Sequence, residues 1–371
     1  MLRKLLSFKF SIRFFLPSKS KIIIFDKEGS TEIRDYVLTN HNDYVLYDYT
    51  KIFIYINFKF VYCYLRNIIK HWNTQKSIMN NLYIIYISSE IEIINPMIII
   101  TYNDDNLIYH SLIKIIKNAK FIAIQNGLRE KFVKERIKHD INHDYYFSFG
   151  SIDENKQSSY QWKFNHIIPI GSLRAGIALN LFHNLKKKHQ IAYVSEYMEY
   201  DDNDLSVNDL QSFQRETDQH VANYYKKNSS KKVIIVLRSN KYSEKKYFNK
   251  LFGNKICFSK PSEYLNSYKT IIESNLVIGF CSTLLVEALA LSTKTLSIDP
   301  SDSDNYFCFD DTLHYRFKNS QDLSYTINTL HDMPYEDYLK NIKNYLPLLM
   351  NINKNSLPHI KIAEFVNRTI N

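Results

Sequence analysis

Residues 275–299 read NLVIGFCSTLLVEALALSTKTLSID, and this stretch decides the fold. The apolar run 276–280 predicts a strand that ends around Gly279, and the run 284–291 predicts a helix that Ser282 and Thr283 introduce. A second β-branched run at 294–299 predicts the next strand. Strand, helix and strand in this order are typical of a parallel α/β sheet.

The same alternation fills the rest of the chain. In the first half we expect a helix at 106–119 and strands at 21–25, 44–49, 51–56, 82–87, 97–102, 120–125 and 145–150. In the second half we expect helices at 204–227 and 282–291 and strands at 190–196, 231–239, 256–259, 275–280 and 294–299. The sequence therefore predicts an α/β protein of two Rossmann-like, doubly wound domains that face a central cleft.

Two domains also fit the length of 371 residues. The cationic stretch 181–190, LFHNLKKKHQ, carries no periodicity and predicts the seam. We expect an N-terminal domain at 1–182, a C-terminal domain at 190–350, and a C-terminal helix in 351–371 that packs back across the domains.

Composition excludes several classes of protein. The chain has only seven glycines and contains no G-x-G-x-x-G, G-x-x-x-x-G-K-[ST] or G-x-S-x-G, which argues against typical dinucleotide enzymes, P-loop NTPases and α/β-hydrolases. The four cysteines form no C-x-x-C, so neither a disulfide framework nor a zinc ribbon is indicated and a reducing, cytoplasmic setting fits. The net charge is +10, of which residues 1–180 carry +8, but no RNP-like motif points to nucleic acid.

The N-terminal segment MLRKLLSFKFSIRFFLP, residues 1–17, is cationic and apolar. Lys9 and Arg13 interrupt what would be the core of a signal peptide, and no cleavage site follows. We expect residues 1–20 to contact a membrane surface, which would place the protein in the cytoplasm, peripheral at the inner face of the membrane. The alternative is a first helix packed on the body of the protein.

Ser282 and Thr283 predict an anion site, because free backbone N–H groups and the helix dipole favour a phosphate at a helix N-terminus. Glu287 lies four residues after Thr283, one turn along the same face, about 6 Å away. That spacing matches the separation of a phosphate from a ribose diol, which a carboxylate can bind. The alternative is that one hydroxyl is only an N-cap and that Glu287 is only a solvated helix edge.

These residues resemble the donor-binding segment of GT-B glycosyltransferases of bacterial surface-carbohydrate (capsule and lipopolysaccharide) biosynthesis. CDP-glycerol glycerophosphotransferases and bacterial sialyltransferases are related to that group. Further resemblance lies in IIIFDKEGS (22–30), ITYNDDN (100–106), FIAIQNGLRE (121–130), DYYFSFG (144–150) and IIPIGSLRAG (167–176). The resemblance implies an N-terminal acceptor domain and a C-terminal nucleotide-sugar domain.

By position, the resemblance implies donor contacts from Ser282, Thr283, Glu287 and Gly279. Arg238 stands where relatives place a basic residue near the donor phosphates, although their K-x-H-P pattern reads V-L-R-S here. An arginine fork suits a departing phosphate whose charge grows in the transition state. The alternative for Arg238 is a surface salt bridge.

The first domain is expected to bind the acceptor and to supply the catalytic base. The acceptor-binding candidates are Gln125, Asn126, Gly127 and Arg129, which follow a strand, although Asn126-Gly127 is also a plain turn pattern. The candidates for the base are Asp105 and Glu28 first, then Asp26 and Asp104, all of which follow strands at the same sheet edge. The alternative for each acid is a helix N-cap or a solvated loop.

No metal site is expected. Asp302-Ser303-Asp304 and Asp202-Asn203-Asp204 match a D-x-D motif but lie in acid-rich loops. His139 and His143 are four residues apart without a third ligand in register, which predicts loop histidines.

The sequence therefore predicts a metal-independent glycosyltransferase of the EC 2.4 class without a cofactor. It would move a sugar from a CMP-, UDP- or GDP-linked donor, as co-substrate, to a hydroxyl of a growing glycan or lipid-linked glycan. Three alternatives stay open: a CDP-glycerol- or ribitol-type polyol-phosphate transferase, a sugar-nucleotide 2-epimerase, and a non-catalytic glycan-assembly partner.

Overall fold

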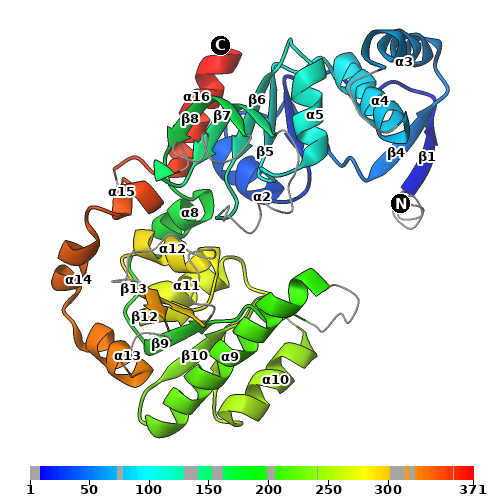
Figure 1. Ribbon diagram of the computed structural model, residues 1–371. Coiled ribbons are helices and arrows are strands. Elements are labelled where there is room, and N and C mark those ends of the chain that lie inside the picture. The colour runs from blue at the N-terminus through cyan, green and yellow to red at the C-terminus, as the bar shows by residue number, and fades with distance from the viewer. Residues whose placement is uncertain are drawn as a thin grey trace. The chain divides into compact units, whose positions relative to one another are not determined.

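The computed structural model describes residues 9–72, 78–128, 141–152, 162–198, 205–239, 241–300, 314–316, 322–353 and 355–371 (Figure 1). The chain forms two compact units. Unit 1 comprises Met1–Asn126, Lys138–Leu173 and Asn353–Asn371, and unit 2 comprises Gly127–Ile137 and Arg174–Ile352. The boundary therefore precedes most of helix α8 (Leu173–Phe182), whereas the sequence predicted a seam after it, at 181–190.

Unit 1 is built on a six-stranded parallel sheet with the strand order β3-β2-β5-β6-β7-β8. These strands are β2 (Ile22–Phe25), β3 (Tyr44–Tyr47), β5 (Ile98–Thr101), β6 (Lys120–Ile124), β7 (Asn142–Ser148) and β8 (Lys163–Pro169). Strands β2 and β5 are buried at every position, as expected of inner strands covered on both faces. The order reverses between β2 and β5, so the carboxyl ends of these strands form the switch point of the sheet.

Short helices cover the sheet of unit 1. They are α2 (Ser30–Glu32), the π-helical turn η1 (Ile33–Val37), α5 (Leu107–Ile115) and the C-terminal α16 (Pro358–Ile370). Helix α16 lies against η1 and β5, and the ring of Phe365 contacts those of Tyr145 and Phe147. The C-terminal segment therefore returns to unit 1 after the chain has completed unit 2.

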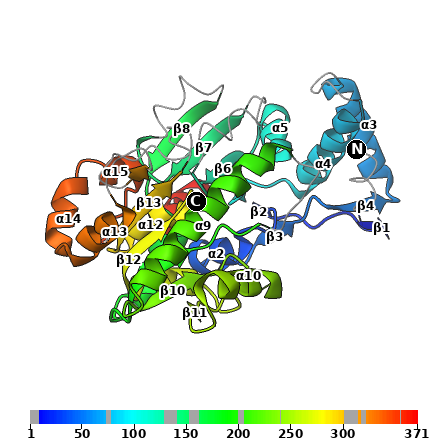
Figure 2. The same ribbon diagram turned by 60° about the horizontal axis from the view of Figure 1, so that its bottom comes forward.

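Unit 1 also carries a two-stranded ribbon and a pair of packed helices, the second of which contributes buried isoleucines to the core of the main sheet (Figures 1 and 2). Strands β1 (Lys9–Arg13) and β4 (Lys51–Tyr55) pair in parallel as a separate two-stranded ribbon, and α3 (Phe58–His71) packs on α4 (Ile78–Ile94). The prediction of a strand at 82–87 is wrong, because these residues belong to α4. Its buried isoleucines recur at helical spacings of three and four, at Ile84, Ile87, Ile91 and Ile94. The alternative of an N-terminal helix also fails for residues 9–13, which form β1.

Unit 2 contains a second parallel sheet with the order β11-β10-β9-β12-β13-β14. Its strands are β9 (His189–Val194), β10 (Val233–Val236), β11 (Cys257–Phe258), β12 (Ser274–Gly279), β13 (Lys294–Asp299) and β14 (His314–Arg316). Numbered within the sheet, this is the Rossmann order 3-2-1-4-5-6, with its switch point between β9 and β12.

The helices of unit 2 surround this sheet. Besides α8 they are α9 (Leu205–Lys227), α10 (Tyr242–Phe252), α11 (Asn266–Ile272), α12 (Thr283–Ala290), α13 (Leu323–Asp332), α14 (Tyr335–Ile342) and α15 (Leu346–Leu349). The predicted strand–helix–strand at 275–299 is confirmed as β12, α12 and β13. In the part of the chain that the structure describes, no helix is both long and apolar enough to cross a membrane.

Candidate functional site in unit 2

The amino end of α12 lies directly after β12, at the switch point of the second sheet. Ser282 is the N-cap of this helix, and its hydroxyl accepts from the N–H of Leu284 at 3.4 Å. The hydroxyl of Thr283 accepts from the N–H of Leu128 at 3.1 Å. The predicted alternative, an N-cap serine, is therefore present, and the helix dipole still directs its positive end to this edge of the sheet.

Gly279 allows β12 to approach β9 and α12 closely. A Cβ at this position would lie 3.3 Å from both Cβ and the carbonyl oxygen of Val194, and 3.5 Å from Cδ2 of Leu285. Gly279 is therefore a packing residue of the strand end, and its role as a donor contact stays a prediction.

Arg238 and Glu196 follow the neighbouring strands β10 and β9, of which β9 borders the switch point. Nη1 of Arg238 lies 3.5 Å from Oε2 of Glu196, and the hydroxyl of Ser282 also hydrogen-bonds Glu196. Burial raises the pKa of Glu196, and Ser282 and Arg238 oppose that rise. The Arg238 side chain is 51% exposed, so the guanidinium can reach a ligand as well as hold the ion pair.

Glu244 of α10 holds the ends of both strands together. Its carboxylate is fully buried and accepts from Oγ of Ser195 at 2.6 Å. It also accepts from the N–H groups of Arg238 and Ser239 and from Oγ of Ser239, each at 2.9 Å. These four hydrogen bonds fix the backbone that carries Arg238.

Glu287 is buried inside α12, with 3% of its surface exposed, so it is not the solvated helix edge of the alternative interpretation. The hydroxyl of Tyr268, from α11, lies 2.9 Å from both carboxylate oxygens. A buried carboxylate needs a hydrogen-bond partner, and Tyr268 is one. The role of Glu287 as a ribose contact stays a prediction.

A small pocket of about 120 Å³ lies next to this edge, between α9, α10 and the segment after β9. The rings of Tyr197 and Tyr247 face each other in it at 5.2 Å, and the Tyr247 hydroxyl donates to Asp218 at 2.8 Å. Burial raises the pKa of Asp218 to about 6.

In unit 1 the structure brings several of the predicted acids to the switch point of the first sheet. Asp26 follows β2 with a φ of 84°, and its Oδ2 accepts from Nδ2 of Asn103 at 3.1 Å. Oε1 of the exposed Glu28 accepts from Nδ2 of Asn126 at 3.3 Å. The predicted juxtaposition of the segments after β2, β5 and β6 is therefore present within unit 1.

Asp104 and Gln125 lie deeper than predicted. Asp104 is fully buried and accepts from the Tyr146 hydroxyl at 3.0 Å and from the Asn126 N–H at 3.4 Å. Gln125 is also fully buried, and its Oε1 accepts from the N–H of Phe149 at 2.6 Å. Both side chains hold the strand ends in place, whereas Asp105 is half-buried and Glu28 is exposed. Gly127 is buried in the turn that follows, and Arg129 lies outside the described residues.

Most residues of the predicted histidine pair and D-x-D motifs lie outside the described residues. They include His139, Asp202, Asp302 and their neighbours. The prediction of His143 as a loop histidine is wrong: it lies in β7, 2% exposed, with its ring stacked on Phe164 at 5.0 Å. Within the described ranges, no group of three or more His, Cys, Asp or Glu side chains could hold a metal ion. Metal independence stays a prediction.

The two parallel Rossmann-like sheets define a protein of the GT-B fold class. Residues 122–322 match the model of a family described as "putative O-antigen biosynthesis protein", and the chain belongs to that family. This agrees with the resemblance to surface-carbohydrate enzymes. No curated protein sequence matches the chain.

Solved structures with the same fold include two kinds of protein. A UDP-GlcNAc 2-epimerase from Neisseria meningitidis bound to UDP-GlcNAc has a TM-score of 0.51 and 11% identity, covering 94% of this chain and 98% of that one. A variant of the wall teichoic acid polymerase TagF soaked with CDPG has a TM-score of 0.55 and 13% identity, covering 96% and 90%. At these identities the likeness establishes the fold.

Sequence reasoning missed Glu196, Glu244 and Tyr268. Glu196 is the last residue of the predicted strand 190–196, and its place at the strand end was the available signal. Glu244 and Tyr268 lie on helices, and their partners Ser195 and Glu287 are 49 and 19 residues away in the sequence, so no local pattern marks these contacts.

Proposed function

We propose that the chain is a glycosyltransferase that takes a sugar from a nucleotide donor bound at the switch point of unit 2. The observation that carries the proposal is the convergence of the α12 amino end, Ser282 and the half-exposed Arg238 at the carboxyl ends of β9, β10 and β12. Helix N-termini and arginine forks both favour phosphate, and parallel sheets bind ligands at this edge.

In this proposal the donor phosphate takes over the pairing of Arg238 from Glu196. The guanidinium and the helix dipole stabilise the negative charge that grows on the phosphate as the sugar–phosphate bond breaks. Burial raises the pKa of Glu196, and Arg238 opposes that rise. When Arg238 turns to the phosphate, Glu196 therefore becomes more readily protonated. Glu287 is the proposed partner of the ribose hydroxyls, which would take the place of the Tyr268 hydroxyl as donors.

The acceptor hydroxyl needs a base, and the exposed or half-buried acids of unit 1 are the proposed source. Asp105 and Glu28 stay first, because Asp104 is closed off by its own partners. A carboxylate there would take the acceptor proton as the new glycosidic bond forms. We propose that the acceptor is a surface glycan, in line with the O-antigen biosynthesis family, and that no divalent metal takes part.

Product analysis tests the reaction class. The protein is incubated with CMP-, UDP- and GDP-linked sugars and with CDP-glycerol, together with a lipid and glycan extract of cells that make the glycan. Sugar transfer predicts release of the free nucleotide together with a sugar added to the extract. Release of CMP with phosphate incorporation would instead indicate a polyol-phosphate transferase, and conversion of the sugar nucleotide without extract an epimerase.

The matched variants for this assay are Arg238→Ala and Lys250→Ala. Lys250 is an exposed cation in the last turn of α10. The proposal predicts loss of product for Arg238→Ala and an unchanged rate for Lys250→Ala. Equal rates for both would remove Arg238 from the site.

A further inference from the structure

Helix α3 carries an apolar face that the rest of the chain leaves exposed. The six side chains on it range from 43% to 87% exposed, and they are Phe58, Val61, Tyr62, Leu65, Ile69 and Trp72 (the last directly after the helix). Their spacings of three and four residues place them on one stripe along the full length of the helix. An exposed apolar surface of this extent is typical of an interaction site.

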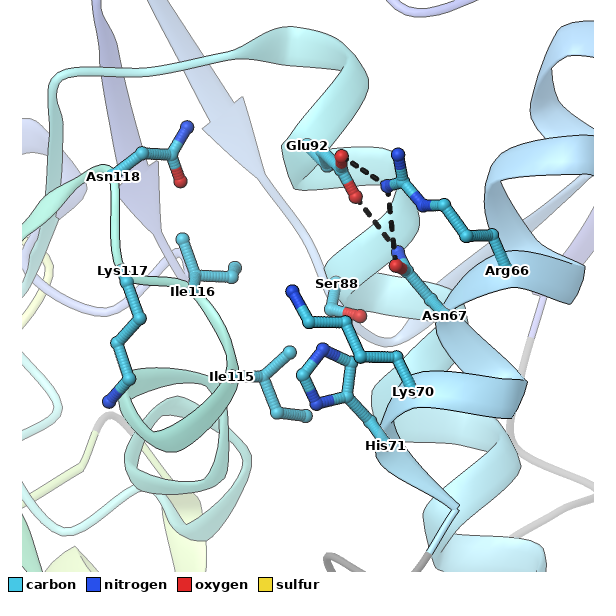
Figure 3. Close-up of a pocket in the computed structure, with 10 residues that line it drawn as sticks. All are labelled: Arg66, Asn67, Lys70, His71, Ser88, Glu92, Ile115, Ile116, Lys117 and Asn118. Carbon is cyan, nitrogen blue, oxygen red and sulfur yellow. Dashed lines mark hydrogen bonds and ion pairs between the residues drawn. The ribbon is translucent and has the colours of Figure 1, made fainter.

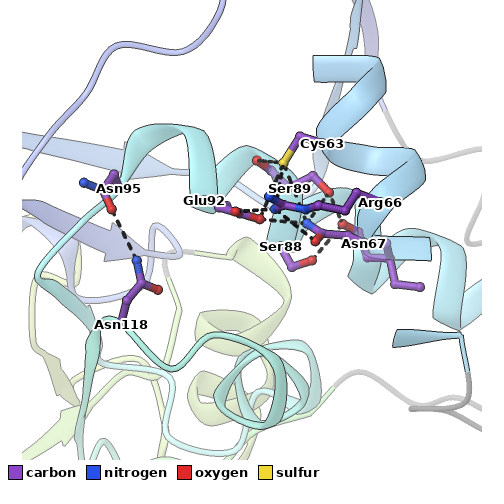
Figure 4. Close-up of polar contacts among 9 residues, drawn as sticks. Cys63, Arg66, Asn67, Ser88, Ser89, Glu92, Asn95 and Asn118 are labelled. Carbon is purple, nitrogen blue, oxygen red and sulfur yellow. Dashed lines mark hydrogen bonds and ion pairs between the residues drawn. The ribbon is translucent and has the colours of Figure 1, made fainter. Parts of the chain in front are cut away.

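The opposite face of α3 is fixed to α4, so the orientation of the stripe is set by packing. Phe60, Cys63 and Asn67 are buried on that side. Nδ2 of Asn67 donates to Oγ of Ser89 at 3.1 Å and to Oε2 of Glu92 at 2.9 Å, and Arg66 pairs with the same Glu92 (Figure 4). Because polar bonds hold the inner face, the helix cannot turn its apolar stripe inward without breaking them.

The β1–β4 ribbon also exposes apolar side chains. Ile12 of β1 is 61% exposed, and Phe14 and Phe15, which follow it, are 64% and 86% exposed. From β4 and its end, Ile54 and Ile56 are also exposed. In the described residues, more than half of the exposed large apolar side chains therefore belong to residues 12–72.

The charge next to the stripe is positive. On a helical wheel, Lys59, Arg66 and Lys70 all fall on the same flank of the apolar stripe. Arg66 and Lys70 also line a pocket of about 390 Å³, to which His71 and Lys117 contribute from either side (Figure 3). The carboxylate of this pocket, Glu92, is neutralised by Arg66. An apolar stripe with aromatic residues and a cationic flank is the pattern of a helix that lies in a lipid interface.

We propose that the apolar face of α3, with the β1–β4 ribbon, docks unit 1 on a lipid bilayer that contains anionic headgroups. The apolar side chains enter the headgroup–acyl boundary while Lys59 and Lys70 contact lipid phosphates. The surface includes β1, Phe14 and Phe15 of the segment 1–20, which the sequence predicted to contact a membrane, and α3 extends it beyond that segment. It does not depend on the donor site in unit 2.

Co-sedimentation of the full chain with vesicles tests the proposal. The vesicles contain either phosphatidylcholine alone or phosphatidylcholine with 30% phosphatidylglycerol, a composition we choose for the assay. We expect binding to the anionic vesicles and at least ten-fold weaker partitioning onto the neutral ones. The double variant Lys59→Ala/Lys70→Ala should bind anionic vesicles about 30-fold more weakly, since each cation near such a surface contributes about 1 kcal/mol.

Ile69→Glu tests the apolar stripe, and Tyr325→Glu is its matched control, because Tyr325 is also largely exposed but lies on α13 of unit 2. We expect Ile69→Glu to abolish vesicle binding and Tyr325→Glu to leave it unchanged. The melting temperature of the same samples, with and without nucleotides, shows whether each variant is folded and still binds nucleotide. A failure of lipid binding can therefore be distinguished from a failure of nucleotide binding.

Three results would overturn the proposal. The first is absence of binding by the wild-type chain to anionic vesicles, and the second is equal binding by Ile69→Glu. The third is concentration-dependent self-association of the wild-type chain in sedimentation velocity that Ile69→Glu abolishes, which would assign the face to a second copy of the chain.

Discussion

Replacing Glu244 by alanine should loosen the strand ends that carry Arg238. The wild-type carboxylate is fully buried and accepts four hydrogen bonds, two from backbone N–H groups and two from the hydroxyls of Ser195 and Ser239. Alanine removes all four acceptor contacts and leaves the two backbone donors without this acceptor in a partly buried position.

The magnitude follows from these bonds. A hydrogen bond to a charged group contributes about 1.5–3 kcal/mol, and a buried donor without a partner costs about 1–3 kcal/mol. The hydroxyls can rotate to other acceptors, so the two backbone donors dominate and the expected loss is about 3–5 kcal/mol. For a unit of this size each kcal/mol lowers the melting temperature by about 2–4 °C, which gives a decrease of about 6–20 °C.

Differential scanning fluorimetry of wild type, Glu244→Ala and Glu244→Gln measures this effect. Glu216→Ala is the control, because Glu216 lies on α9 with its side chain 48% exposed and a single pair to His220 at 4.0 Å. We expect an intermediate decrease for Glu244→Gln, which retains one acceptor oxygen, and a change of at most about 4 °C for Glu216→Ala, since exposed pairs contribute about 0–1 kcal/mol. A decrease for Glu244→Ala no larger than that of the control would refute the role given to Glu244.

Two further predictions concern unit 1. Gly29→Ala should lower the free energy of unfolding, measured with urea, by about 2–4 kcal/mol, because Gly29 has a φ of +66° and a Cβ there would lie 2.3 Å from Cγ of Tyr102. An unchanged urea midpoint would contradict the structure of this turn. Burial raises the pKa of Glu90, to which Tyr47 donates, to about 7, so the folded state holds a proton that the unfolded state releases near 4.5. The stability that this proton contributes is present below pH 4.5 and is lost as the pH rises through 7. The unfolding free energy of wild type should therefore fall by about 3 kcal/mol relative to Glu90→Gln between pH 4.5 and 8, and parallel pH curves would refute it.

Much of the fold could be predicted because short apolar runs in the sequence mark its inner strands. Runs such as 22–25 and 98–101 are β-branched or aromatic at every position, and the polar residues after them mark the ends of the strands. The segment 275–299 gave strand, helix and strand almost to the residue, since Ser282 caps α12 as its sequence suggests.

The errors also have physical causes. The run 82–87 has the composition of a strand, and only the longer spacing through Ile94 reveals the helix α4. The depth of Asp104 and Gln125 depends on Tyr146 and Phe149, which approach from the adjacent strand β7 and the residues just after it, and Glu244 reaches β9 and β10 from a helix. These contacts join residues far apart in sequence, which periodicity does not encode.

The measurement that tests the central claim most directly is the melting temperature in the presence of CMP, CDP, UDP, GDP and their sugars. A nucleotide at 100 times its dissociation constant should stabilise the protein by about 2.7 kcal/mol, a rise of about 5–10 °C. We predict such a rise for one nucleobase, most of it lost in Arg238→Ala and Glu287→Gln and retained in Lys250→Ala. A folded wild-type sample that responds to none of these nucleotides, or an Arg238→Ala variant that responds fully, would contradict the donor site.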